Sequence, residues 1–129
     1  MKAFSLIADE ITAHEAEDDP RNQHILIYVD GKIVPRSEAK VSVYDSGFML
    51  GDGVWEGLRF YNGSWAFLDE HINRLFEAAK AIDLDINLNK VELITALEKT
   101  RVANRITKDA HARVCLLYTS DAADDLRGG

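Results

Sequence analysis

Two dipeptides, Asp30-Gly31 and Asn62-Gly63, constrain this chain most, because each separates two short runs rich in β-branched and aromatic residues. Both central residues of a two-residue hairpin loop adopt positive φ angles, which Asn, Asp and Gly tolerate best. The sequence therefore predicts one antiparallel hairpin over residues 25–34 and a second over residues 54–68. A fold built around two local hairpins contains an antiparallel sheet.

Two further strands are predicted outside these hairpins. Val41, Val43 and Tyr44 are β-branched or aromatic, which favours a short strand between the hairpins. The run that begins at His111 predicts a final strand near the end of the chain.

Two helices are predicted between residues 69 and 102. The first, capped by Asp69, carries apolar residues at helical spacing: Ile72, Leu75, Phe76, Ala79 and Ile82. The second, capped by Asn87 or Asn89, carries a broad apolar arc: Val91, Leu93, Ile94 and Leu97. Because the strands come mostly before the helices, the order of elements predicts an α+β fold with a hairpin-rich antiparallel sheet.

The overall composition limits the classes of function. A chain of 129 residues with a net charge of −7 fits one acidic domain, whereas nucleic-acid and anionic-membrane surfaces need a basic face. No apolar run approaches the roughly 20 residues of a membrane span, and no secretory signal pattern is found, so we expect a cytoplasmic protein. The single cysteine excludes a disulfide framework.

Both ends of the chain differ from its middle. Residues 1–24 form an acidic leader, interrupted by Pro20, that predicts a marginal helix or a solvated arm. Residues 115–125 resemble the translation of a transposase adapter used in sequencing libraries. We therefore expect a truncated domain over residues 25–114 and a non-native tail over residues 115–129; the alternative is a genuine final strand with an acidic tail.

The strand predicted over residues 54–61 separates two kinds of side chain. Successive strand residues point to opposite faces, so Trp55, Gly57 and Arg59 share one face, while Glu56 and Leu58 share the other. Glu56 is predicted to be structural. A face with Trp, Gly and Arg is typical of the wall of a binding site, because glycine lets a ligand approach. Core packing of Trp55 and a surface charge at Arg59 are the alternatives.

Other catalytic patterns are not indicated. The four histidines, at positions 14, 24, 71 and 111, have no metal-ligand spacing, so we predict no metal site. Ser46 lies in no nucleophile-elbow motif. Gly51-Asp52-Gly53 is only half of a glycine-rich phosphate loop, and we interpret it as a bend before the strand.

A combined pattern is more specific than any of these. Residues 45–59 read Asp-Ser-Gly-Phe-Met-Leu-Gly-Asp-Gly-Val-Trp-Glu-Gly-Leu-Arg, and residues 69–75 read Asp-Glu-His-Ile-Asn-Arg-Leu. In this order and spacing they resemble the class IV (fold type IV) pyridoxal-phosphate (PLP) aminotransferases. The resemblance covers about residues 25–114 and includes Tyr-Val-Asp-Gly-Lys-Ile-Val-Pro at residues 28–35. It implies the N-terminal domain of such an enzyme.

The resemblance implies roles for four residues. In the family, the arginine of the Glu-His-x-x-Arg-Leu element contacts the cofactor phosphate, which implies that Arg74 binds PLP; a guanidinium suits phosphate oxygens. An exposed ion pair between Arg74 and Glu70 is the alternative. The family lines its substrate pocket from the face with the aromatic residue of the strand. That carry-over implies substrate contacts for Trp55, Gly57 and Arg59.

The resemblance also implies an activity that this chain does not complete. Family members use PLP to exchange an amino group between an amino acid and a 2-oxo acid, and they need a Schiff-base lysine. No lysine here matches its context, so we assign no catalytic residue and expect the 129-residue chain to be inactive. Branched-chain amino acids are the leading substrates. D-amino-acid transamination, an aminodeoxychorismate lyase, or a small α+β binding domain without cofactor are alternatives; a homodimer is expected of the full-length protein.

Overall fold

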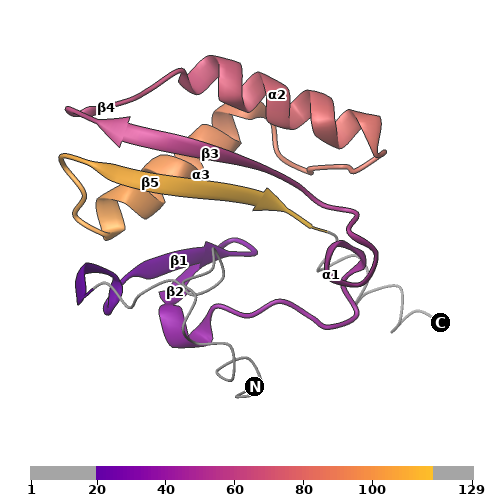
Figure 1. Ribbon diagram of the computed structural model, residues 1–129, viewed down its shortest axis with the longest axis horizontal. Helices are drawn as coiled ribbons and strands as arrows, with labels where there is room; N and C mark the ends of the chain where they lie inside the picture. The colour runs from indigo at the N-terminus through magenta and orange to yellow at the C-terminus, as the bar shows by residue number, and fades with distance from the viewer. Residues whose placement is uncertain (1–19, 118–129) are drawn as a thin grey trace, which may run out of the picture.

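A computed structural model describes residues 20–117 of the chain. In chain order the elements are η2 (Pro20–Asn22), β1 (Leu26–Val29), β2 (Lys32–Pro35), η3 (Arg36–Glu38), α1 (Ser46–Leu50), β3 (Val54–Tyr61), β4 (Ser64–Trp65), α2 (Leu68–Ala81), α3 (Lys90–Ala103) and β5 (Ala110–Leu116). β1 and β2 form one antiparallel sheet, and β4, β3 and β5 form another in that order (Figure 1). The predicted α+β class is confirmed. Residues 1–19 of the predicted leader and residues 118–129 of the predicted tail lie outside the described residues.

Both predicted hairpin turns are confirmed. Asp30 and Gly31 have φ angles of 51° and 86°, and Asn62 and Gly63 have the same pair of values. Positive φ at both central residues is the type I′ geometry, whose twist matches that of the flanking strands. The first turn therefore closes β1 onto β2, and the second closes β3 onto β4.

The second hairpin is shorter than predicted. β4 ends at Trp65, whereas the sequence predicted a returning strand as far as Leu68. Phe67 has a φ of 52°, a left-handed conformation through which a strand does not continue, and Leu68 begins α2. Phe67 is therefore the N-cap residue. The predicted cap, Asp69, lies inside the first helical turn, where its charge suits the helix dipole.

The strand predicted at Val41, Val43 and Tyr44 is wrong. The segment is irregular, and all three side chains are exposed. The Tyr44 N–H donates to the Ser42 hydroxyl, and the Asp45 N–H donates to the Ser42 carbonyl, so the backbone closes a turn here. β-branched residues favour a strand only where it packs against neighbours, and no strand among residues 20–117 pairs with this segment.

The two long helices hold the core against β3. Ile72 and Leu75 of the predicted α2 stripe are buried, as is Ala79, and Leu93 of α3 joins the first two in one apolar cluster. Leu58 of β3 is fully buried. α2 lies along β3 in Figure 1, and α3 lies behind β3 and β5. No helix within residues 20–117 is long and apolar enough to cross a bilayer.

Asn89, and not Asn87, caps α3. Its side chain accepts a hydrogen bond from the Glu92 N–H at 2.8 Å, while the Glu92 carboxylate accepts one from the Asn89 N–H at 3.0 Å. This reciprocal capping box satisfies two backbone donors at the helix start. Asn87 instead adopts a φ of 61° in the connection between the helices.

β5 extends past the predicted end of the domain. The predicted final strand begins at Ala110 and ends at Leu116, so Cys115 lies opposite Trp55 and Leu116 opposite Val54. The boundary expected at Val114 does not coincide with the end of this strand. The adapter-like origin of residues 115–129 stays a prediction.

Asn104 attaches the first hairpin to α3. It is the C-cap residue of that helix, and its side-chain oxygen accepts a hydrogen bond from the Leu26 N–H at 2.7 Å. Its amide nitrogen donates to the Leu26 carbonyl at 2.9 Å and to the Thr100 carbonyl at 2.8 Å. The primary amide pairs with β1 as a neighbouring strand would, so it holds the β1–β2 sheet beside the helix.

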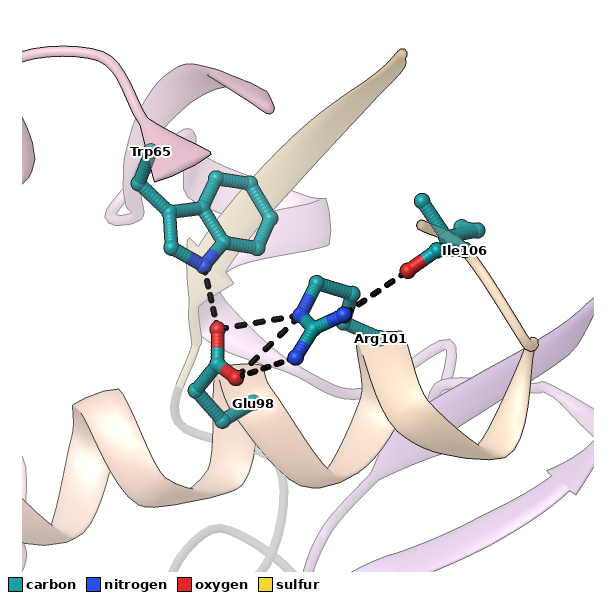
Figure 2. Close-up of polar contacts among 4 residues, drawn as sticks. All are labelled: Trp65, Glu98, Arg101 and Ile106. Carbon is teal, nitrogen blue, oxygen red and sulfur yellow. Dashed lines mark hydrogen bonds and ion pairs between the residues drawn. The ribbon is translucent and has the colours of Figure 1, made fainter. Parts of the chain in front are cut away.

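A polar cluster of Trp65, Glu98 and Arg101 attaches the second hairpin to α3 (Figure 2). The Trp65 indole N–H donates to the Glu98 carboxylate, and the Arg101 guanidinium donates both to that carboxylate and to the Ile106 carbonyl. Arg101 also lies over the ring of Phe60, 4.8 Å from its centroid. The cluster therefore joins β3, β4 and α3 at the hairpin end of the larger sheet.

The Glu98 contacts predict how stability changes with acid. The hydrogen bonds from Arg101, and then from Trp65, lower the pKa of Glu98 below its ordinary value of 4.5. Since the folded-state pKa is depressed, this stabilisation is present above pH 4.5 and is lost as the pH falls through the folded-state pKa. We expect Glu98→Gln to lose less stability on acidification than the unsubstituted chain, as measured by urea unfolding between neutral pH and pH ~3.

The matched control is Glu77→Gln, an exposed glutamate of α2 that makes no ion pair with the described residues. This variant is expected to follow the acid profile of the unsubstituted chain. Identical profiles for all three proteins would contradict the prediction.

Candidate functional site

The face of the larger sheet turned away from α2 carries polar and aromatic side chains. Trp55 is 60% exposed, and Arg59 is also exposed, whereas Glu56, Leu58 and Phe60 are buried. The predicted alternation of the two faces is therefore confirmed. We call the first set the outer face: Trp55, Gly57, Arg59 and Tyr61 of β3 with His111 and Arg113 of β5.

Arginine and aromatic side chains pair across this outer face. The Arg113 guanidinium lies over the Trp55 ring, 4.7 Å from its centroid, and the Arg59 guanidinium lies 5.4 Å from the centroid of Tyr61. Cation–π contacts at exposed positions are worth about 0.5–1 kcal/mol each. They hold two positive charges against an apolar surface, which suits a ligand with an anionic group and an apolar part.

Gly57 lies at the centre of the outer face. Arg113 is its partner across the β3–β5 pair, and the His111 ring leans over it. A Cβ atom built on Gly57 would lie 3.2 Å from Nε2 of His111, closer than an ordinary contact. The room that the sequence suggested above this glycine is therefore used in part by the imidazole.

The sequence analysis did not assign His111 and Arg113 to the site. Both belong to the strand that it predicted, and their i, i+2 spacing shows that they share a face. Only the pairing of β5 with β3 shows that this is the face of Trp55, because the two strands are far apart in the chain.

Arg74 is held by a buried carboxylate rather than by Glu70. Its Nε atom lies 3.0 Å from Oε1 of Glu56, and Nδ1 of His71 lies 2.8 Å from Oε2 of the same residue. The Arg74 side chain is 70% exposed, whereas that of Glu56 is 9% exposed. The ion pair weighed with Glu70 is replaced by a contact between helix and strand, and the guanidinium stays open to a ligand.

The structure does not bring all four predicted site residues together on one face. Trp55, Gly57 and Arg59 share the outer face of β3, whereas the partner of Arg74, Glu56, belongs to the opposite face. Among residues 20–117, no group of three His, Cys, Asp or Glu side chains is placed to hold a metal ion. The chemistry of the described site is therefore that of guanidinium and aromatic groups.

Guanidinium groups beside exposed aromatic side chains on an α+β scaffold are typical of a domain that binds an anionic small molecule. A family model described as amino-transferase class IV matches residues 53–127. The chain belongs to the class IV aminotransferase family.

Its relatives differ in the reactions that their names describe. A protein of Methanocaldococcus jannaschii, provisionally named a branched-chain-amino-acid aminotransferase, is 46% identical over 88 residues, which are 68% of this chain and 30% of that protein. A D-alanine aminotransferase of Listeria monocytogenes is 42% identical over 80 residues (62% and 28%). An aminodeoxychorismate lyase of Bacillus subtilis is 37% identical over 99 residues (77% and 33%).

Solved structures give the same family. The branched-chain aminotransferase of Thermoproteus uzoniensis, solved with norvaline, has a TM-score of 0.65 and 35% identity, with 70% of this chain and 32% of that chain covered. A second branched-chain amino acid aminotransferase, from T.th. and complexed with N-(5'-phosphopyridoxyl)-L-glutamate, has a TM-score of 0.66 and 29% identity (72% and 32%). The chain thus spans about a third of the length of the relatives it matches.

Proposed function

We propose that this chain is the N-terminal part of a PLP-dependent aminotransferase, which moves an amino group between an amino acid and a 2-oxo acid. The observation that carries the proposal is the exposed guanidinium of Arg74, fixed at Nε by Glu56 within the Glu-His-x-x-Arg-Leu element. Its two terminal nitrogens make no hydrogen bond or ion pair with residues 20–117, so they suit a phosphate group.

PLP, when bound, supplies the electron sink for chemistry at the amino acid Cα. In the proposed site Arg74 holds its phosphate, and Trp55, Gly57 and Arg59 contact the substrate. The substrate carboxylate is anionic, and Arg113 and His111 place further donors on the outer face beside Trp55. The Schiff-base lysine is supplied by polypeptide outside this chain.

Branched-chain amino acids are the proposed substrates, because an exposed tryptophan offers an apolar wall and relatives carry that name. D-amino-acid transamination and the aminodeoxychorismate lyase reaction are the alternatives, and relatives carry both names. We further propose that the complete protein is a cytoplasmic homodimer.

A coupled assay for 2-oxo acid formation tests the proposal. It needs the complete protein from the parent gene, or a chimera in which residues 25–114 replace the matching segment of the Thermoproteus uzoniensis enzyme. With PLP and 2-oxoglutarate, turnover is expected with leucine and not with D-alanine, while the 129-residue chain alone gives only the free-PLP background. Faster turnover of D-alanine would favour the first alternative, and release of pyruvate from aminodeoxychorismate the second. A complete protein that binds no PLP would contradict the proposal.

Arg74→Ala in the complete protein is expected to weaken PLP binding by about one to two orders of magnitude, because hydrogen bonds to a charged phosphate are worth about 1.5–3 kcal/mol. The measurement is an absorbance titration of the apoprotein with PLP. Lys80→Ala on the same helix is the control, since Lys80 is exposed and more than one turn away, and it should leave the affinity unchanged. Full PLP affinity in Arg74→Ala would show that the phosphate lies elsewhere.

Trp55→Ala is expected to change the ranking of amino donors and to leave PLP affinity nearly intact, because Trp55 lies on the outer face away from the Glu56–Arg74 pair. Removing the ring shortens the apolar wall, which is expected to lower kcat/KM about tenfold for branched donors, on the scale of one to two lost methylene contacts. The measurement is kcat/KM over branched, aromatic and D-amino donors. A loss of PLP binding equal to that of Arg74→Ala would reverse the two assignments.

A further inference from the structure

Glu56 is a buried carboxylate that contacts two residues of the facing helix. It belongs to the buried face of β3, between Val54 and Leu58, and is 7% exposed. Oε1 accepts from Nε of Arg74 at 3.0 Å, and Oε2 lies 2.8 Å from Nδ1 of His71. A carboxylate only accepts hydrogen bonds, so Nδ1 of His71 carries the proton of this contact. Each oxygen of Glu56 therefore has its own donor on α2.

The choice of Nε on Arg74 matters for what the guanidinium can still bind. The group is planar, with Nε on one edge and the two terminal nitrogens on another. Glu56 occupies the Nε edge and leaves the fork of terminal nitrogens free of the described residues. A phosphate takes two parallel hydrogen bonds from such a fork.

Glu56 also restricts a side chain that would otherwise be mobile. Arg74 is 70% exposed, and a free arginine of this exposure samples many rotamers. The buried acceptor fixes the plane of the guanidinium, and the His71 contact fixes the second oxygen of Glu56, so that the carboxylate cannot rotate freely. The cost of ordering Arg74 is then met on folding rather than on ligand binding.

We propose that Glu56 is a positioning residue for phosphate binding: it orients Arg74 so that the terminal nitrogens of the guanidinium face the phosphate of PLP. This inference rests on the proposed function. It replaces the sequence interpretation of Glu56 as a purely structural residue. A structural tie between β3 and α2 would stabilise the domain but would not distinguish a phosphorylated ligand from its unphosphorylated counterpart.

The test compares PLP with pyridoxal, which lacks the phosphate, in the complete protein. The ratio of the two dissociation constants measures phosphate recognition, because the ring and the aldehyde are common to both. We expect Glu56→Ala to reduce this ratio about tenfold while the affinity for pyridoxal stays unchanged. Glu56→Gln keeps the size of the side chain and removes its charge, so it folds where the alanine variant does not, and it is expected to reduce the ratio in the same direction.

A double-mutant cycle tests whether Glu56 acts through Arg74. In an Arg74→Ala background, the Glu56 substitutions are expected to have no further effect on the ratio. Leu58→Ala is the control, since it disturbs the same face of β3 without contacting Arg74, and it should lower stability and leave the ratio unchanged.

Three outcomes decide the inference. A Glu56 effect of equal size on PLP and pyridoxal, or one that multiplies with that of Arg74→Ala, would overturn it and leave the proposed function in place. An unsubstituted protein that binds neither ligand would overturn both. A ratio that falls in the Glu56 variants and not in Leu58→Ala, with no added effect in the Arg74→Ala background, supports it.

Discussion

Leu75→Ala is expected to lower the free energy of unfolding of the chain by about 2–5 kcal/mol, the range for truncating a fully buried leucine. Leu75 has no exposed surface and packs with Ile72 and Leu93, where the two helices meet. The substitution removes apolar contacts and leaves a cavity that the rigid sheet beneath α2 cannot close. Urea unfolding monitored by tryptophan fluorescence measures the change.

Val91→Ala is the control for this substitution. Val91 is an apolar residue of α3 that is 72% exposed, so its truncation is expected to change stability by less than about 0.5 kcal/mol. Equal losses in Leu75→Ala and Val91→Ala would mean that the α2–α3 contact is not the core of the domain.

Asn104→Ala is expected to cost about 2–3 kcal/mol, because it removes three hydrogen bonds and leaves both backbone groups of Leu26 without their amide partner. Asn104→Asp should be at least as destabilising, since its carboxylate would face the carbonyls of Leu26 and Thr100. Urea unfolding gives the size of the effect. Hydrogen exchange at the Leu26 amide locates it, and this exchange should become fast in both variants.

The control is Asn73→Ala, which removes one exposed hydrogen bond with Lys90 and should be nearly neutral. If Asn104→Ala kept the Leu26 amide protected, the first hairpin would have to be held by other contacts.

The parts of the fold that could be predicted are those that depend on neighbours in the sequence. The two turns at Asp30-Gly31 and Asn62-Gly63 needed only positive φ at two adjacent residues, and both were confirmed. The strand expected at Val41 and Val43 failed because strand formation depends on a partner that the local sequence does not reveal. The Asn104 amide on Leu26 joins residues 78 positions apart, and a lone asparagine after a helix gives no indication of it.

The candidate site divides in the same way. Alternation along β3 placed Trp55 and Arg59 on one face before any pairing was known. The partner of Arg74 was sought one helical turn away, at Glu70, whereas the contact runs across to Glu56 on the strand. Helical spacing describes neighbours on one helix surface and carries no information about the strand beneath it.

The alternation in β3 has a consequence for how this gene can change length. Trp55 and Glu56 are consecutive, yet one faces outward over Arg113 and the other is buried against α2. Inserting or deleting one codon within β3 would exchange the faces of every residue beyond it, placing a tryptophan where a carboxylate is buried. Single-codon length changes are therefore excluded from this strand, while the connection between α3 and β5, which is exposed at Thr107, Lys108 and Asp109, can absorb them.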